Sequence, residues 1–375
     1  MTPPTSSATH PEPAVAPTLA DGQRSAAAPS GLFRPNQRSH AAGRLLAAAG
    51  LAGTGVSLPY WADPYTTATA ARILALALLA VSVSVLTGHA GLPTLGQTAP
   101  FAVGAYTTAI LAGHHHPLGT VGVVQVAAAA AAAAGCSALT GLLLVHTRGT
   151  VYLMVSVAIG NLAVTAADQW TSVTGGTNGL NFLPPVRPLP GLGELGTDRA
   201  TYWYCLATAG LCLTVVWLVL RGPAGMLLRG VRDHEPRMQA SGHPTARYLY
   251  TAHVGAGALA GVGGALLVTV QHAITPGDAG FDTAAIALLA GAVGGRSITG
   301  TLAGLAAIIA ARDVAGGPFA GHTPALVGGL YLLCVYLLPD GALTAASSIP
   351  GRVRARLARH RTRPDAAAAR TEAKP

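Results

Sequence analysis

Apolar runs of about 20 residues alternate with short polar segments through most of this chain. A run of that length spans the hydrocarbon core of a bilayer as an α-helix. The pattern therefore predicts an all-α polytopic membrane protein with about ten transmembrane helices. The expected limits are 43–60, 66–87, 90–112, 119–145, 150–168, 201–220, 248–270, 281–295, 298–312 and 323–339. The segments 281–295 and 298–312 are short and glycine-rich, which fits either two spans or one folded-back hairpin.

The stretch from Leu86 to Leu111 is apolar but broken by four glycines and two prolines. Backbone groups without partners are costly in lipid, so a broken helix persists only where it packs on protein or lines a wet cavity. Interrupted segments of this kind indicate a transport path. We expect Gly91, Thr94, Gly96 and Gln97 to line or gate that path. The alternative is a flexible loop between two spans.

Charged residues make up only 10% of the chain, and the net charge is +9. When the N-terminus is placed inside and ten spans alternate, only four of the 23 lysines and arginines fall outside, namely Arg72, Arg187, Arg199 and Arg312. Cytoplasmic loops are enriched in Lys and Arg, so we expect a multi-pass protein of the cell membrane with both termini in the cytoplasm. The arginines of 352–363 favour an anchor on anionic membrane lipid over a nucleic-acid site.

This topology divides the chain into five parts. They are a disordered cytoplasmic tail over 1–42, spans 1–6 over 43–220, a cytoplasmic loop over 221–247, spans 7–10 over 248–339 and a basic cytoplasmic tail over 340–375.

The loop over 221–247 is too long and too patterned for a simple connector. Met226, Leu227, Leu228 and Val231 form an apolar face, with Arg229, Arg232 and Asp233 on the other side of the same turns. Pro236 suits the first turn of a new helix, with Asp233 or His234 as its cap. Gly242 is typical of a helix end. We therefore expect two short helices with a kink between them, either docked on a partner protein or lying in the lipid headgroups.

Ionisable residues narrow the possible chemistry. The only lysine is Lys374, so the chain has no Walker A loop and cannot hold ATP in that way. Asp and Glu lie at predicted span ends or in loops, whereas ion-coupled carriers commonly place carboxylates within the membrane. Three adjacent histidines, His114–His116, have poor geometry for one metal ion, and we expect no metal site there. Asn161 lies at membrane depth, where it either hydrogen-bonds across helices or lines the path.

Five blocks of sequence resemble the permease subunits of the branched-chain amino acid ABC transporter family. In chain order they are Gly91–Thr107, Val151–Gly160, Thr174–Leu180, Gly225–Glu235 and Ala258–Gly264. The third block, TGGTNGL, is similar to the TGGSNGL of the family almost letter for letter. The fourth keeps the spacing of the family's coupling loop.

The resemblance implies a non-enzymatic transport subunit of an ATP-driven importer of branched-chain or related amino acids. It implies two ATPase subunits that carry ATP and Mg²⁺, a second homologous permease and an extracytoplasmic substrate-binding protein, with no cofactor in this chain. Coupling to the ATPases is then assigned to Gly225, Arg229, Arg232, Asp233, Glu235 and Gly242. The path is assigned to Thr174, Gly175, Gly176 and Asn178 in addition to Asn161 and the residues of the broken stretch.

The chain departs from the family pattern at Pro93, at Pro236 and over Gly295–Thr301. The substrate is therefore left open, with urea or short amides as alternatives within the family. From a different class, a stand-alone channel or secondary carrier is the main alternative. A non-transporting scaffold fits less well, because a scaffold does not need a broken polar segment.

Overall fold

Helices account for all the regular elements of the computed structural model in the residues that it describes. These residues are 53, 55–57, 59–61, 63–113, 119–189, 193–294, 297–316 and 328–329. The helices in chain order are α2 (Pro64–Ser84), π-helical η1 (Val85–Ala90), α3 (Thr98–Gly113), α4 (Gly122–Leu144), α5 (Gly149–Gln169), α6 (Thr171–Thr174), η2 (Gly176–Asn178), α7 (Asp198–Arg221), α8 (Pro223–Ala240), α9 (Thr245–Gln271), η3 (Pro276–Ala279), α10 (Phe281–Gly294) and α11 (Ile298–Gly316).

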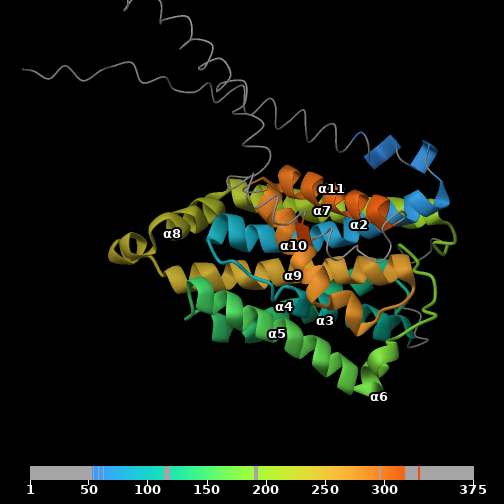
Figure 1. The fold of residues 1–375 in the computed structure, drawn as a ribbon, viewed down its shortest axis with the longest axis horizontal. Helices are drawn as coiled ribbons and strands as arrows, with labels where there is room; N and C mark the ends of the chain where they lie inside the picture. The colour runs from blue at the N-terminus through green and yellow to red at the C-terminus, as the bar shows by residue number, and fades with distance from the viewer. Residues whose placement is uncertain are drawn as a thin grey trace, which may run out of the picture.

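Helix α9 runs through the middle of the bundle, where it packs against α2, α3 and α4 (Figure 1). Its sequence is rich in glycine and alanine, so neighbouring backbones approach closely. A Cβ atom on Gly104 of α3 would lie 2.5 Å from the Cα of Gly261 on α9. A Cβ on Gly263 would lie 2.8 Å from the carbonyl oxygen of Ala75 on α2. Small residues therefore set the spacing of the three central helices.

Five segments of the described chain are long and apolar enough to cross a membrane. They are Pro64–Ala90, Gly122–Leu144, Gly149–Gln169, Asp198–Arg221 and Thr245–Gln271. Each matches a predicted span within a few residues, which confirms a polytopic α-helical membrane protein. The predicted spans 43–60 and 323–339 lie largely outside the described residues, as do both tails and His114–His116. The number of ten spans and the five divisions of the chain remain predictions.

The predicted pair at 281–295 and 298–312 forms two helices, α10 and α11, which pack against each other and against α2. With 14 residues, α10 is about 21 Å long, shorter than the hydrocarbon core of a typical bilayer. Helix α11 has 19 residues and is nearly long enough to span it.

The loops gather at two opposite ends of the bundle (Figure 1). At the α8 end, Arg148, which precedes α5, forms an ion pair with Glu235 of α8. At the α6 end, isolated β-bridges join Leu180 to Ile274 and Val121 to Arg187. A chain that crosses the membrane back and forth should place alternate loops on the same side. The loops joined by these contacts lie at the same end of the bundle, as that pattern predicts.

Candidate functional site

The broken stretch of the sequence begins where α2 widens into the π-helix η1. Gly91 ends η1 in the left-handed conformation, with φ at 75°, which favours glycine. The chain then runs without regular structure to a turn before α3 at Thr98. The predicted interruption is confirmed, and it lies at the α8 end.

Arg232, on the surface helix α8, contacts this break in the membrane helix. Its guanidinium donates a hydrogen bond to the Gly88 carbonyl, one of the groups exposed where the helix ends. A Cβ on Gly91 would lie 2.8 Å from the Cγ atom of Arg232. The sequence pattern placed Arg232 on the side away from the apolar face, and this was wrong: its side chain packs inward onto the break.

Helix α8 is kinked in the way that the sequence predicts. His234 has non-helical torsions, with φ at −154° and ψ at 80°, two residues before Pro236. At its end, Gly242 has φ at 81°, the Gly242 amide donates to the Gln239 carbonyl, and the His243 amide donates to the Met238 carbonyl. This pair of bonds is a Schellman motif, which closes the helix at the expected glycine.

The inner face of α8 packs on the bundle through Leu228 and Val231, which join Leu92 and Leu249 in an apolar cluster. Gly225 is buried. It packs so closely on the end of α7 that an added Cβ would lie 2.6 Å from the carbonyl carbon of Leu220. Two of the other residues predicted for coupling, Arg229 and Asp233, are exposed. Met226, expected on the apolar face, is 66% exposed, so that expectation was wrong. The outer face of α8 therefore carries both charged and apolar side chains, whereas its inner face packs on the bundle.

Glu235, beside the kink, ties α8 to the loop between α4 and α5. Its carboxylate accepts two hydrogen bonds of 2.8 Å from Nε and Nη2 of Arg148. The Thr245 hydroxyl donates to the same carboxylate at 3.2 Å. The hydrogen bonds from Arg148 lower the pKa of Glu235 below its ordinary value. Because the folded-state pKa is lowered, this tether contributes above the ordinary glutamate pKa of about 4.3 and is lost as the pH falls through the lowered pKa.

Replacing Glu235 with glutamine removes the negative charge of the carboxylate and therefore the ion pair with Arg148. We expect amide hydrogen exchange in α8 to accelerate by roughly tenfold at pH 7, because a charge-assisted hydrogen bond contributes about 1.5–3 kcal/mol. In the unmodified chain the same exchange protection is expected to stay constant between about pH 8 and 5, after correction for the intrinsic exchange rate. The matched control is Glu194→Gln, because Glu194 makes an equally short but half-exposed pair with Arg187. Equal exchange in the two variants would contradict the role of the tether.

Thr94, Gly96 and Gln97, predicted for the path, are buried against α5 and neighbouring helices. A Cβ on Gly96 would lie 2.6 Å from the Ser156 carbonyl oxygen, and the Ser156 hydroxyl accepts from the Leu95 amide at 3.2 Å. Thr94 accepts from the Gly96 amide at 3.1 Å. Gln97 is fully buried, and neither side-chain polar atom has a hydrogen-bond partner in the part of the chain that the structure describes. These residues therefore line no open route in this conformation.

The block TGGTNGL forms a glycine turn at the α6 end, far from α8. The Thr174 hydroxyl donates to the Ala167 carbonyl at 2.5 Å, and Gly175 ends α6 in the left-handed conformation. Gly176 is buried, whereas Asn178 is exposed. A Cβ on Gly179 would collide with the Ile274 carbonyl oxygen, so the turn lies directly on the segment after α9. The predicted path residues thus fall into two groups at opposite ends, with Asn161 between them along α5.

Asn161 projects from the outer face of α5 and is exposed. Within the described chain it makes no hydrogen bond to another helix, so the structure does not support the first of its two predicted roles. It borders a groove with Leu95, Thr98 and Phe281.

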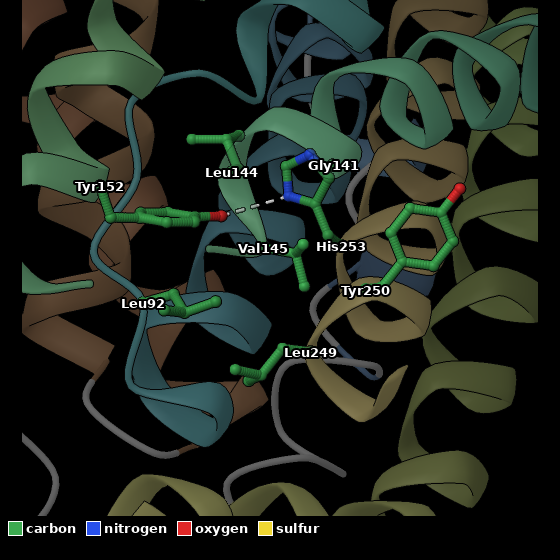
Figure 2. A pocket seen from close by; sticks show the side chains of 8 residues that line it. All are labelled: Leu92, Gly141, Leu144, Val145, Tyr152, Leu249, Tyr250 and His253. Carbon is green, nitrogen blue, oxygen red and sulfur yellow. Dashed lines mark hydrogen bonds between the residues drawn. The ribbon is translucent and has the colours of Figure 1, made fainter. Parts of the chain in front are cut away.

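A buried polar cluster that sequence reasoning missed lies near the α8 end, between α4, α5 and α9. The Tyr152 hydroxyl is 3.2 Å from Nδ1 of His253, and the Thr140 hydroxyl is 3.3 Å from Nε2 of the same ring. Figure 2 shows the Tyr152–His253 contact beside Leu92 and Leu249, which line the same small cavity. The signal in the sequence was a single histidine within the apolar run 248–270. In the described residues, no three His, Cys, Asp or Glu side chains gather in a way that would hold a metal ion.

Comparison with known proteins supports the resemblance seen in the sequence. A family model described as the permease component of the branched-chain amino acid transport system matches residues 65–338. The high-affinity branched-chain amino acid transport system permease protein LivM of Escherichia coli is 25% identical over 310 residues, which cover 77% of this chain and 72% of that protein. The LivM protein of Salmonella typhimurium is 25% identical over 314 residues, with the same two shares. No solved structure matches the chain at a comparable level of significance.

The family match and the five apolar spans agree, and the match extends over nearly three quarters of the sequence. The chain therefore belongs to the family of branched-chain amino acid transport permeases.

Proposed function

We propose that this chain is a membrane subunit of an ATP-driven importer of branched-chain or related amino acids. The observation that carries the proposal is the contact of Arg232 with the break at Gly88–Gly91. Through this contact, a kinked surface helix is fixed directly to the interrupted segment of a membrane helix. Any displacement of α8 by a partner is then passed to the break. The family and the two LivM relatives support the choice of substrate.

The energy source in this proposal lies outside the chain. Two ATPase subunits bind ATP and Mg²⁺, because the sole lysine, Lys374, leaves no residue for a Walker A loop here. The α8 end faces the cytoplasm, since positive charge concentrates on that side of membrane proteins and six described arginines lie in or beside α8. These are Arg148, Arg221, Arg229, Arg232, Arg237 and Arg247.

The outer partners follow from the same orientation. A substrate-binding protein docks at the α6 end, where the turn at Thr174–Asn178 is presented, and a second homologous permease completes the membrane part. The solute then passes the break at Gly91–Gln97 when α8 moves. Closure of this segment in the present conformation corresponds to a resting state of the cycle.

The coupling role is tested by deleting residues 229–235 in the complex assembled with its native partner subunits. The deletion removes both Arg232 and Glu235, the two ties that hold α8 in place. We expect ATPase activity to lose its stimulation by substrate while basal hydrolysis persists on the partner subunits. Stimulation at the level of the unmodified complex would exclude α8 as the coupling element.

A further inference from the structure

The buried carboxamide of Gln97 lies in the turn between the break and α3. Gln97 is 0% exposed, and neither its Nε2 nor its Oε1 has a hydrogen-bond partner among the described residues. Gln125 on α4 is 1% exposed, but its Nε2 donates to the Gly119 carbonyl at 2.7 Å. A carboxamide that is removed from water without gaining hydrogen bonds raises the free energy of the state in which it is buried. The closed break therefore carries a local free-energy cost at Gln97.

Helix α5 covers this turn. The Leu95 amide donates to the Ser156 hydroxyl at 3.2 Å, and a Cβ on Gly96 would lie 2.6 Å from the Ser156 carbonyl oxygen. One turn further along α5, a Cβ on Gly160 would lie 3.0 Å from the Thr98 hydroxyl. Separation of α5 from the turn would therefore open the contact that closes the break.

Helix α5 is itself buried only along a narrow strip. Four of its 21 residues are buried, namely Tyr152, Ser156, Gly160 and Ala167, and only Tyr152 has a large side chain. In the central helix α9, by contrast, 16 of 27 residues are buried. Figure 1 shows α5 along the edge of the bundle. Because stabilisation by burial scales with the apolar area removed from water, α5 can separate from the bundle at lower cost than the central helices.

Helix α8 is tied to both sides of the contact between α5 and the break. Before its kink, Arg232 donates to the Gly88 carbonyl at the break. After its kink, Glu235 accepts two hydrogen bonds from Arg148, which directly precedes α5. His234, with its non-helical torsions, lies between these two ties. A change in the bend at His234 therefore moves the start of α5 relative to the break.

We propose that the contact between α5 and the turn at Gln97 is a latch, that the unpartnered carboxamide favours its opening, and that α8 opens it by bending at His234. The inference rests on the proposed function, because a partner subunit must displace α8. In the open state the carboxamide gains hydrogen bonds to water or to the polar groups of the solute. Gln97 thereby offsets part of the cost of moving α5.

Gln97→Met tests the contribution of the carboxamide. Methionine is unbranched and flexible like glutamine, but it has no strong hydrogen-bond donor or acceptor. We expect the thermal unfolding midpoint of the complex purified with its native partner subunits, without nucleotide, to rise by roughly 2 °C or more. Gln97→Leu is the second variant, since leucine removes the same polar atoms in a smaller side chain.

The matched control is Gln125→Met, which deletes a buried carboxamide that is hydrogen-bonded. Its unfolding midpoint is expected to fall, because the Gly119 carbonyl loses the hydrogen bond from Gln125. The two deletions should therefore shift the midpoint in opposite directions. An unchanged or lowered midpoint, or loss of the assembled complex, in both Gln97 variants would overturn the role of Gln97.

An engineered disulfide reports directly on the latch. Cysteines at positions 98 and 160 are introduced after Cys136, Cys205, Cys212 and Cys334 are replaced by alanine. In the closed conformation the side chains at these two positions are close enough for a disulfide to form. We expect oxidation to crosslink them at least about fivefold more slowly in the complex trapped with ATP and vanadate than in the nucleotide-free complex. Glu235→Ala should abolish this difference, because Arg148 then no longer ties α5 to α8.

The control pair is Ser84→Cys with Gly291→Cys, which joins α2 to α10. A Cβ on Gly291 would lie 3.7 Å from the Cβ of Ser84, within the range for a disulfide, and this crosslinking rate should not depend on nucleotide. Equal rates with and without ATP at positions 98 and 160, the same change at the control pair, or a change that survives Glu235→Ala would overturn the latch. Import of leucine by the complex is measured separately. Its absence refutes the proposed function, whereas import with an unchanged crosslinking rate refutes the latch alone.

Discussion

Replacement of Arg232 with alanine is expected to uncouple the assembled importer. The substitution removes the hydrogen bond to the Gly88 carbonyl and the packing of the arginine stem on Gly91. Hydrogen bonds to charged groups contribute about 1.5–3 kcal/mol, so stimulation of the ATPase by substrate should fall by roughly tenfold or more. Basal ATPase activity of the partner subunits should change little, because they do not contact the break in this account.

The matched control for this substitution is Arg247→Ala. Arg247 lies at the start of α9, at the same end of the bundle, and is exposed. It carries the same charge, but within the described chain its side chain makes no hydrogen bond or ion pair with η1. A loss of stimulation of equal size in both variants would show that only the positive charge of this end matters, and would contradict a specific lock between α8 and the break.

Replacement of Gly104 with alanine is expected to destabilise the bundle by about 1–3 kcal/mol, the usual range for overpacking. The new methyl group would lie 2.5 Å from the Cα of Gly261, and backbone cannot rotate away as a long side chain does. Helices α3 and α9 must then separate along their contact. A lowered midpoint of thermal unfolding in detergent, with reduced yield of folded protein, is the measurement.

Gly135→Ala is the control for this second substitution. Gly135 lies within α4, and nothing lies within 4 Å of the position that its Cβ would occupy. Alanine there improves helix propensity by about 1 kcal/mol at most, so stability should be unchanged or slightly raised. A fall in the unfolding midpoint as large as that of Gly104→Ala would mean that close contact of α3 and α9 is not the cause.

The interruptions of the helices could be predicted from the sequence because they depend on local chemistry. Gly91 requires a positive φ, and Pro236 cannot continue the helix before it, so both breaks are visible in the residues themselves. The limits of most spans follow from the length of apolar runs in the same way.

Contacts between distant segments could not be predicted in this way. The inward direction of Arg232 depends on a carbonyl 144 residues away, which periodicity within α8 does not encode. The pairing of His253 with Tyr152 likewise requires α5 and α9 to be placed side by side first. For Asn161, sequence indicated membrane depth but not whether the side chain points inward or outward, because α5 has apolar residues on several faces.

The most direct test of the account is uptake of radiolabelled leucine by liposomes that contain either this chain alone or the complex purified with its native partners. The account predicts uptake only in the complex, only with ATP supplied on the side of the ATPase subunits, and only with the substrate-binding protein present on the other side. Uptake of leucine by the chain alone, without ATP, would contradict it and would identify the protein as a stand-alone carrier or channel.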